Sequence, residues 1–344
     1  MFISMSIIMQ KYKVVFGIDV SKDNLDIVNR VNNSEVDEHY FQVKNKVSVL
    51  QKWLAELSVV DKSSTLFVLE PTGTYSSKII AMLHQAGFKI ALVTPLKSDG
   101  FSKALGVVSK NDHQAASNLA MMGTLLKLSL YQAPSEIMQK KKQVHMGLKA
   151  LNKQAQQLHN QLHAMDQMAF VMPQVKEALQ TSLQVVKEQI AYLEAQLEEL
   201  DEKDDEAYHQ QMKLLTSVVG IGEKTARLLY LATGGIHHFD FSRQVSKFVG
   251  LIPYSHHSGT SVRVNGRMTK RGNNQLRATL YMAARSAIRY NLACKELYER
   301  LRAKGKPYKK AMVAVMNKLV RQAFGCVNSG TPFDNRHYLK FKEN

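Results

Sequence analysis

The chain has 344 residues, 45% of them hydrophobic and 22% charged, and this ordinary globular composition excludes a disordered or collagen-like protein. Two cysteines cannot build a disulfide framework or a four-cysteine zinc site, and no run of 18 apolar residues predicts a membrane span. The formal net charge is +17, and residues 207–344 hold all of this excess, with 24 Lys and Arg against 6 Asp and Glu. This predicts nucleic acid as the partner, since each neutralised phosphate releases counterions; a basic membrane-surface protein is the alternative.

Strands and helices alternate along residues 10–134, which predicts an α/β domain. Runs of β-branched and aromatic residues predict strands over residues 11–20, 21–31, 38–43, 65–71 and 88–95. Pro71 and Pro95 are expected to close the last two of these strands. Apolar residues at helical spacing predict helices over residues 46–57, 76–87 and 112–128.

Residues 135–206 carry two heptad patterns on either side of Pro173. Apolar residues recur at alternating steps of four and three from Val144 to Met165, and again from Leu179 to Leu200. This predicts a coiled-coil hairpin, or two arms of a dimer, that joins protomers into a dimer or tetramer. A helix pair internal to the chain, with no role in assembly, is the alternative.

Residues 207–344 predict a mainly α-helical, basic domain. The stretch TSVVGIGEKTARLLY has the pattern of a helix-hairpin-helix element turning at Gly220 and Gly222. Free N–H groups at the start of its second helix, with Lys224 beside them, suit a nucleic-acid phosphate, although an ordinary helix corner would share the pattern. A Ser/Gly/Arg/Lys loop follows over residues 258–272, before a helix that begins near Asn273.

Three acidic residues occupy positions where an α/β sheet gathers its functional groups. Asp19 ends the first predicted strand, Glu70 ends the strand TLFVLE, and Asp112 opens a helix. Strand ends of such a sheet converge, and three carboxylates there could hold Mg²⁺, a cation that prefers oxygen ligands. Taken singly, each acid is more readily explained as a helix cap or a solvated residue.

Several motifs resemble a known family. GIDVSKD around Asp19, LEPTGTY around Glu70 and KNDHQAASNLA around Asp112 resemble the catalytic blocks of the DEDD transposases of insertion-sequence family one-ten. That family includes Piv-type DNA invertases and bridge-RNA-guided recombinases. VVGIGEKTA, FVGLIPYSHHSGTSVR and RMTKRGNNQLRATLYMAA resemble its C-terminal transposase domain, so the resemblance spans roughly residues 12–335.

The resemblance implies an RNase H/RuvC-like fold for residues 10–134, a coiled-coil region over 135–206 and a C-terminal transposase domain over 207–344. It also implies Mg²⁺ held by four acids in the order Asp, Glu, Asp, Asp. Asp19, Glu70 and Asp112 match the first three, but Ala115 stands where the fourth is expected. An alanine methyl group cannot ligate a metal, so Ala115 is either a natural loss or, as we favour, an inactivating substitution made to trap a complex.

The family uses a serine nucleophile in its C-terminal domain, and Ser258 of SGTSVR matches that position, with Ser261 as the alternate. A serine hydroxyl needs activation, and cations must stabilise the charged phosphate that it attacks. Four basic residues within 13 positions of Ser258 suit that role and nucleic-acid binding: Arg263, Arg267, Lys270 and Arg271.

The resemblance therefore predicts a recombinase that cuts and exchanges strands of target and donor DNA through a covalent phosphoserine, in the cytoplasm of a prokaryote at the nucleoid. The carboxylates of one protomer would meet Ser258 of another, and a noncoding bridge RNA would choose the sites by base pairing. Three alternatives remain open. They are a Piv-like invertase without a guide RNA, a RuvC-like junction nuclease that uses water, and a chain that only binds nucleic acid because of Ala115.

Overall fold

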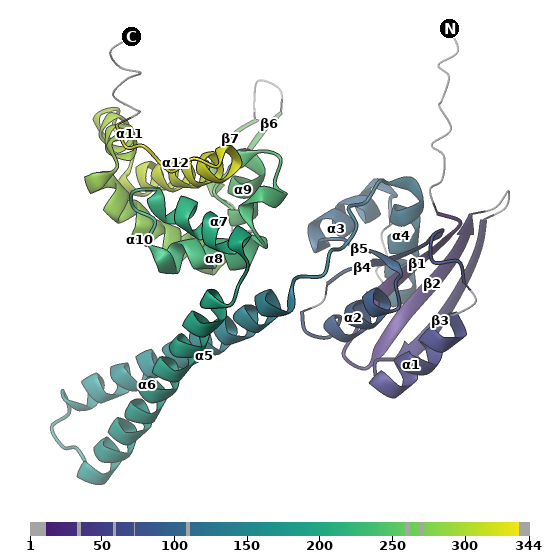
Figure 1. Cartoon of the computed structure of the whole chain (residues 1–344), viewed down its shortest axis with the longest axis horizontal. Helices are drawn as coiled ribbons and strands as arrows, with labels where there is room; N and C mark the ends of the chain where they lie inside the picture. Colours follow the sequence, from purple (N-terminus) through teal and green to yellow (C-terminus); the bar gives the residue numbers. More distant parts are fainter. Residues whose placement is uncertain are drawn as a thin grey trace, which may run out of the picture. The chain divides into compact units, whose positions relative to one another are not determined.

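The computed structural model describes residues 12–32, 36–57, 60–71, 73–107, 111–258, 262–268 and 272–336 (Figure 1). The chain divides into two compact units between Ala133 and Pro134. The first unit is an α/β structure, and the second is built mainly from helices. No helix among the described residues is long and apolar enough to cross a membrane.

A five-stranded mixed sheet forms the first unit, in the order β3-β2-β1-β4-β5. The central strand β1 pairs antiparallel with β2 and parallel with β4, while β2 pairs antiparallel with β3 and β4 parallel with β5. The predicted α/β domain is confirmed, and this strand order agrees with the RNase H-like fold that the resemblance implies. The strands are β1 (Val14–Val20), β2 (Asn24–Asn32), β3 (Val36–Lys44), β4 (Thr65–Leu69) and β5 (Lys89–Leu92).

Helices cover both faces of this sheet. Successive strand residues point to opposite faces, so Phe16 and Ile18 of β1 join one core with α1 and α2, whereas Val15 joins another with α4. The face beneath α4 also holds the alternate positions of β2 and β4, including Val28 and Val68. The helices of this unit are α1 (Val47–Glu56), α2 (Ser77–Gln85), α3 (Pro95–Ala104) and α4 (Asp112–Leu125).

Gly17 lets the backbone of α4 rest directly on β1. A Cβ atom at this position would lie 2.0 Å from the carbonyl oxygen of Ala116 and 2.4 Å from the amide nitrogen of Ala120. Any side chain would therefore push the helix off the sheet. Because Gly17 stands two residues before Asp19, and Ala116 one turn after Asp112, this contact holds the start of α4 at the end of β1 that carries Asp19.

The prediction that Pro95 closes a strand was wrong. Strand β5 ends at Leu92, Thr94 is extended, and Pro95 is the first residue of α3. Proline is favoured at the first helical position because its missing N–H would have no partner there and its fixed φ suits a helix. Proline can thus end a strand or start a helix. Because an apolar run precedes Pro95, the sequence pattern favoured the strand end, and the helix that follows was not predicted.

Two long helices, α5 (Glu136–Met165) and α6 (Pro173–Glu202), form a hairpin in the second unit (Figure 1). The apolar seams predicted on each of them pack against one another, with Leu148, Leu183 and Leu197 buried. Gly147 gives the helices room to approach, since a Cβ there would lie 3.0 Å from a methyl carbon of Leu193. The two helices of one chain therefore bury much of each other's seam.

A helical body completes the second unit around α12, whose buried side chains include Met312, Val315 and Leu319. The stretch predicted as a loop over residues 258–272 contains strand β7, which pairs antiparallel with β6, so that prediction was wrong in part. The helix expected near Asn273 is confirmed, and the Asn273 side chain caps it by accepting from the N–H of Leu276. The elements are α7 (Glu206–Ser217), α8 (Glu223–Thr233), a short 3-10 helix (Ile236–His238), α9 (Ser242–Val249), β6 (Pro253–Ser258), β7 (Val262–Met268), α10 (Asn274–Tyr290), α11 (Leu292–Ala303) and α12 (Tyr308–Ser329).

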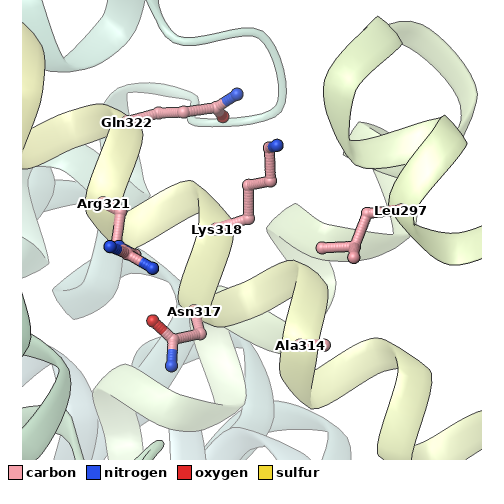
Figure 2. Close-up of a pocket in the computed structure, with 6 residues that line it drawn as sticks. All are labelled: Leu297, Ala314, Asn317, Lys318, Arg321 and Gln322. Atoms are coloured by element: carbon pink, nitrogen blue, oxygen red, sulfur yellow. The ribbon is translucent and has the colours of Figure 1, made fainter. Parts of the chain in front are cut away.

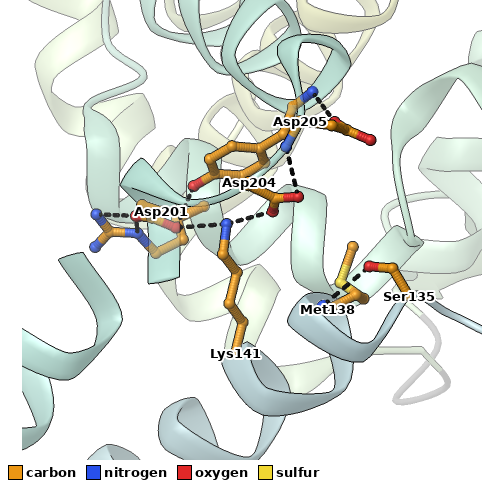
Figure 3. Close-up of polar contacts among 8 residues, drawn as sticks. Ser135, Met138, Lys141, Asp201, Asp204 and Asp205 are labelled. Carbon is orange, nitrogen blue, oxygen red and sulfur yellow. Dashed lines mark hydrogen bonds and ion pairs between the residues drawn. The ribbon is translucent and has the colours of Figure 1, made fainter. Parts of the chain in front are cut away.

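A buried charged network fixes the base of the hairpin to this helical body (Figure 3). The ammonium group of Lys141, on α5, is fully buried and lies 2.8 Å from Asp201 and 2.5 Å from Asp204. It also lies 3.3 Å from the ring centre of Tyr208, whose hydroxyl donates to Asp201 at 2.5 Å. Arg227 of α8 donates to the other oxygen of Asp201 at 2.6 Å. Residues of four helices, α5 to α8, therefore meet in one set of ion pairs and hydrogen bonds at the end of α6.

Replacing Lys141 with methionine should destabilise the protein by about 3–5 kcal/mol, because one partner of a buried ion pair is removed and Asp204 keeps an uncompensated charge. Urea unfolding of the full chain, followed by helical circular dichroism, measures the loss. The matched control is Lys140→Met, which breaks an exposed pair with Glu136 and should cost less than about 1 kcal/mol. Equal losses in the two variants would contradict the role given to Lys141.

Candidate active site

Asp19, Glu70 and Asp112 lie on the α4 side of the sheet. Asp19 is in β1 and Glu70 directly follows β4, and the parallel register pairs Ile18 with Leu69, so the two acids stand side by side in neighbouring strands. Both occupy alternate positions that face α4. Asp112 is the first residue of that helix, which Gly17 allows to rest on β1. Three separate parts of the sequence therefore bring these acids to the end of the sheet at which β1 and β4 finish.

The charges of these acids act on one another. Burial raises the pKa of the Asp19 carboxyl group above its usual value, and the negative charges of Asp112 and Glu70 raise it further. A hydrogen bond from the N–H of Val20 opposes this shift in part. The ionised form of Asp19 is thus held in unfavourable surroundings, and a bound cation would relieve that repulsion.

Asp26 is a fourth acid on this face, and the sequence analysis missed it. It stands on β2 directly across from Asp19, is 3% exposed, and its charge also raises the pKa of Asp19. The Tyr40 hydroxyl and the Gln42 side-chain amide of β3 donate to it at 2.7 and 3.0 Å. Asp26 lies inside β2 and not at a strand end, and the antiparallel register across a short turn at Ser21 places it beside Asp19.

The donor chemistry of the site fits a divalent cation, but the ligand set is incomplete. Among the described residues, no group of three or more His, Cys, Asp or Glu side chains lies close enough together to hold a metal ion. Carboxylates such as those of Asp19, Glu70 and Asp112 are nevertheless the oxygen donors that Mg²⁺ prefers. Ala115, half-buried in α4, lies about one turn after Asp112 on the same side of the helix and contributes no oxygen.

The predicted nucleophile belongs to the second unit of the chain, whereas the acids belong to the first. Ser258 is the last residue of β6 and pairs with Val262 at the start of β7, the strand that carries Arg263 and Arg267. Three more predicted residues lie outside the described part of the chain: Ser261, Lys270 and Arg271. The structure therefore describes the backbone of Ser258, Arg263 and Arg267, which lie on the two strands of one β-hairpin.

The predicted phosphate-binding turn is a tight joint between α7 and α8. Gly220 has a φ of +107°, and a Cβ there would lie 2.8 Å from the Cβ of Ala287 on α10. Close packing and backbone conformation thus both require glycine at that position. Gly222 precedes the first residue of α8, and Lys224 is exposed and lies 3.4 Å from Glu194 of α6. Phosphate binding at this turn stays a prediction.

Comparisons with known proteins identify relatives of both units. A transposase profile of the DEDD type matches residues 16–171, and the profile of the transposase IS116/IS110/IS902 family matches residues 212–299. The pilin gene-inverting protein of Moraxella bovis is 28% identical over 94% of this chain and 98% of that protein. The transposase for insertion sequence element IS1111A of Coxiella burnetii is 34% identical over 43% of this chain and 40% of that protein. A Thermus thermophilus RuvC structure matches 34% of this chain and 99% of that one, with 11% identity and a TM-score of 0.25.

Proposed function

The chain belongs to the IS116/IS110/IS902 family of DEDD transposases, and on that basis we propose that it cuts and exchanges strands of target and donor DNA. One observation assigns this activity to particular residues in the proposal. Asp19, Glu70 and Asp112, which match the family's acidic blocks, come from separate elements to one edge of the sheet, where their charges act on one another. A purely structural set of acids would gain nothing from such repulsion.

In this proposal Asp19, Glu70 and Asp112 would contribute carboxylate oxygens to a Mg²⁺ site that lacks its fourth acid at Ala115. The ion, when bound, supplies Lewis-acid stabilisation for the charge that develops on the phosphate oxygens. The fold contributes the positions of the ligands, because neighbouring strands β1 and β4 fix the first two and the contact of α4 with Gly17 fixes the third.

The Asp19→Asn variant should melt at a higher temperature than the parent chain at neutral pH in EDTA. The pKa of Asp19 is raised in the folded state, so its ionisation costs stability as the pH rises from the usual carboxyl value through the raised one. The gain should therefore vanish in acid, where Asp19 is protonated in both states. Thermal scans at several pH values measure this difference.

Mg²⁺ provides the second half of that test. The ion should raise the melting temperature of the parent chain and have little effect on Asp19→Asn, because a ligand stabilises only the state that binds it. The Asp23→Asn variant, an exposed acid in the β1–β2 turn, should behave like the parent in both conditions. An Asp19→Asn chain that is less stable than the parent in EDTA would show that the acids do not repel as described.

Ser258 is the proposed nucleophile. Its hydroxyl oxygen loses a proton and forms a bond to the scissile phosphorus, while the bond from that phosphorus to one sugar oxygen breaks and this oxygen takes up a proton. Support comes from the match to the family's serine block and from the cations of the same hairpin, Arg263 and Arg267 among them. Because Ser258 and the acids belong to different units, the acids of one protomer and the serine of another can form one active site.

Site choice is assigned in this proposal to a noncoding bridge RNA. The basic residues of 207–344 can hold RNA and DNA through phosphates, and base pairing can read the sequence without many base-edge contacts from the protein. A second candidate, inversion of DNA at fixed sites without a guide, is favoured by the near full-length match to the pilin gene-inverting protein. A defined RNA that copurifies with the chain and is encoded beside its gene would support the first candidate; nucleic-acid-free protein that inverts DNA would support the second.

The hairpin of α5 and α6 is proposed to join protomers through its tip. The seam between its helices is largely filled within the chain, but the turn region displays Met168, Phe170 and Met172, of which Phe170 is 82% exposed. The alternative is a helix pair that serves one chain alone.

Phe170→Asp combined with Met172→Asp should convert the oligomer into monomers, since burying a carboxylate in an apolar contact costs several kcal/mol. Light scattering coupled to size-exclusion chromatography measures the mass. The control is Tyr192→Asp, which changes an exposed aromatic residue in the middle of α6 and should leave the mass unchanged. If the tip variant keeps the parent mass, protomers do not join through the tip.

A further inference from the structure

The outer face of α12 borders two adjoining depressions in the second unit. The first has a volume of about 500 Å³ and lies between α12 and α11 (Figure 2), and the second has a volume of about 230 Å³ and lies between α12 and α9. They share Asn317 and Arg321, so we treat them as one feature, the α12 groove. Its lining residues are Leu297, Ala314, Asn317, Lys318, Arg321, Gln322, Arg243, Ser246 and Ile252.

All charged residues that line the α12 groove are cations. Arg243 and Arg321 are exposed, and neither has a hydrogen bond or ion pair with another residue in the described part of the chain. Figure 2 shows Lys318 extending from α12 into the space that Leu297 faces from α11. Helices α9 and α12 contain no Asp or Glu at all, so no carboxylate from either helix competes for these cations.

Buried hydrogen bonds hold the polar floor of the groove in place. The hydroxyl group of Ser246, 2% exposed, donates to the side-chain oxygen of Asn317 at 3.0 Å. The side-chain amide of Asn291, which is fully buried, donates to the side-chain oxygen of Gln322 at 3.0 Å. The groove therefore combines cationic side chains, of which Arg243 and Arg321 are exposed, with amide side chains held by hydrogen bonds. This is expected of a surface that binds anionic backbone by charge and by hydrogen bonds.

We propose that the α12 groove binds backbone phosphates of the DNA strand on which the β6–β7 hairpin acts. Ile252 lines the groove and directly precedes β6, which ends at Ser258, so a strand that reaches this hairpin passes the groove next to its base. Arg243 and Arg321 can each grip a phosphate with a forked pair of N–H donors. This assignment rests on the proposed function for its choice of DNA over other polyanions.

The double variant Arg243→Gln with Arg321→Gln tests the groove in the full chain. Removing two phosphate contacts should lower the slope of log affinity against log salt by about 1.8, and should weaken binding of a fluorescent DNA duplex by about tenfold or more between about 50 and 200 mM salt. The control is Lys309→Gln, which removes a charge from the same helix but lines neither depression. It should reduce the salt dependence by much less than the double variant does. If net charge alone decided the affinity, the loss of affinity would instead scale with the number of charges removed.

Two further measurements make the result decisive. Arg321→Lys keeps the charge but loses the forked pair of donors, so it should keep the salt dependence of the parent and bind DNA less tightly than the parent but more tightly than Arg321→Gln. The melting temperatures of all variants report whether they fold. A single-stranded RNA probe provides the second arm: an equal or larger loss on RNA than on DNA would overturn the assignment to the DNA strand. Unchanged DNA affinity in a folded double variant would overturn the groove itself.

The results that would overturn the proposed function differ from those that would overturn the groove assignment. If a chain with all four family acids never cleaves DNA, the recombinase proposal fails while groove variants can still lose DNA affinity. If that chain cleaves DNA and the groove variants bind and cleave as it does, only the groove assignment fails.

Discussion

Ala115→Asp should raise Mg²⁺-dependent DNA strand cleavage at least about a hundredfold. Loss of groups that merely support metal ligands costs about 10–100-fold, so a restored direct ligand should do no less. The new carboxylate would stand about one helical turn from Asp112 on the same side of α4, at a position that is half-buried with alanine. End-labelled DNA substrates on denaturing gels, with Mg²⁺ and with EDTA, measure the rate.

Ala115→Asn is the matched control, because its amide has nearly the shape of the aspartate but lacks the charge, and it should remain close to the parent. The Ala115→Asp chain should lose its gain when Asp19→Asn is added. Equal rates for Ala115→Asp and the parent would show that position 115 is not the missing ligand. Vigorous cleavage by the parent chain would rule out the reading in which it only binds nucleic acid.

Ser258→Ala, made in the Ala115→Asp chain, should abolish both strand cleavage and the covalent protein–DNA adduct. The serine oxygen would be the atom that bonds to phosphorus, and alanine has no oxygen to take its place. Affinity for DNA and RNA should stay nearly the same, because one neutral hydroxyl contributes little beside several phosphate contacts. Denaturing gels with end-labelled DNA show the adduct as a shift to the size of the protein.

Ser261→Ala is the control in the same motif and should keep the adduct. An adduct that survives Ser258→Ala but is lost in Ser261→Ala would move the nucleophile to Ser261. If no chain with the complete set of acids ever forms an adduct yet DNA is cut, water is the nucleophile, and the junction-nuclease alternative replaces the recombinase.

Local patterns predicted the elements of the first unit well, because the burial of a strand or of one helix face shows in the spacing of its apolar residues. The strands around Val15, Val28 and Phe67 and the helix opening at Asp112 all lie where apolar runs and periodicity predicted them. The helix starting at Pro95 was missed, because proline is compatible with both a strand end and a helix start. Its apolar pattern is weak, and none of its residues is fully buried.

The site shows the same division between local and tertiary information. The family motifs supplied Asp19, Glu70 and Asp112, but Asp26 could be found only from the register between β1 and β2. The α12 groove had no sequence signature either, since Arg243 and Arg321 are 78 positions apart and meet only when α9 packs on α12. Tertiary packing brings such residues together, and no short stretch of sequence shows that they will be neighbours.

The contact between α4 and Gly17 has a genetic consequence. It fixes the helix through Ala116 and Ala120, whereas the half-buried Ala115 is not among the residues nearest to that contact. Every alanine codon becomes an aspartate or glutamate codon when its second base changes from C to A. If Ala115 is a natural loss, a copy of this gene is one point mutation from regaining an acid at that position. A lineage could then lose and recover the metal ligand by single base changes.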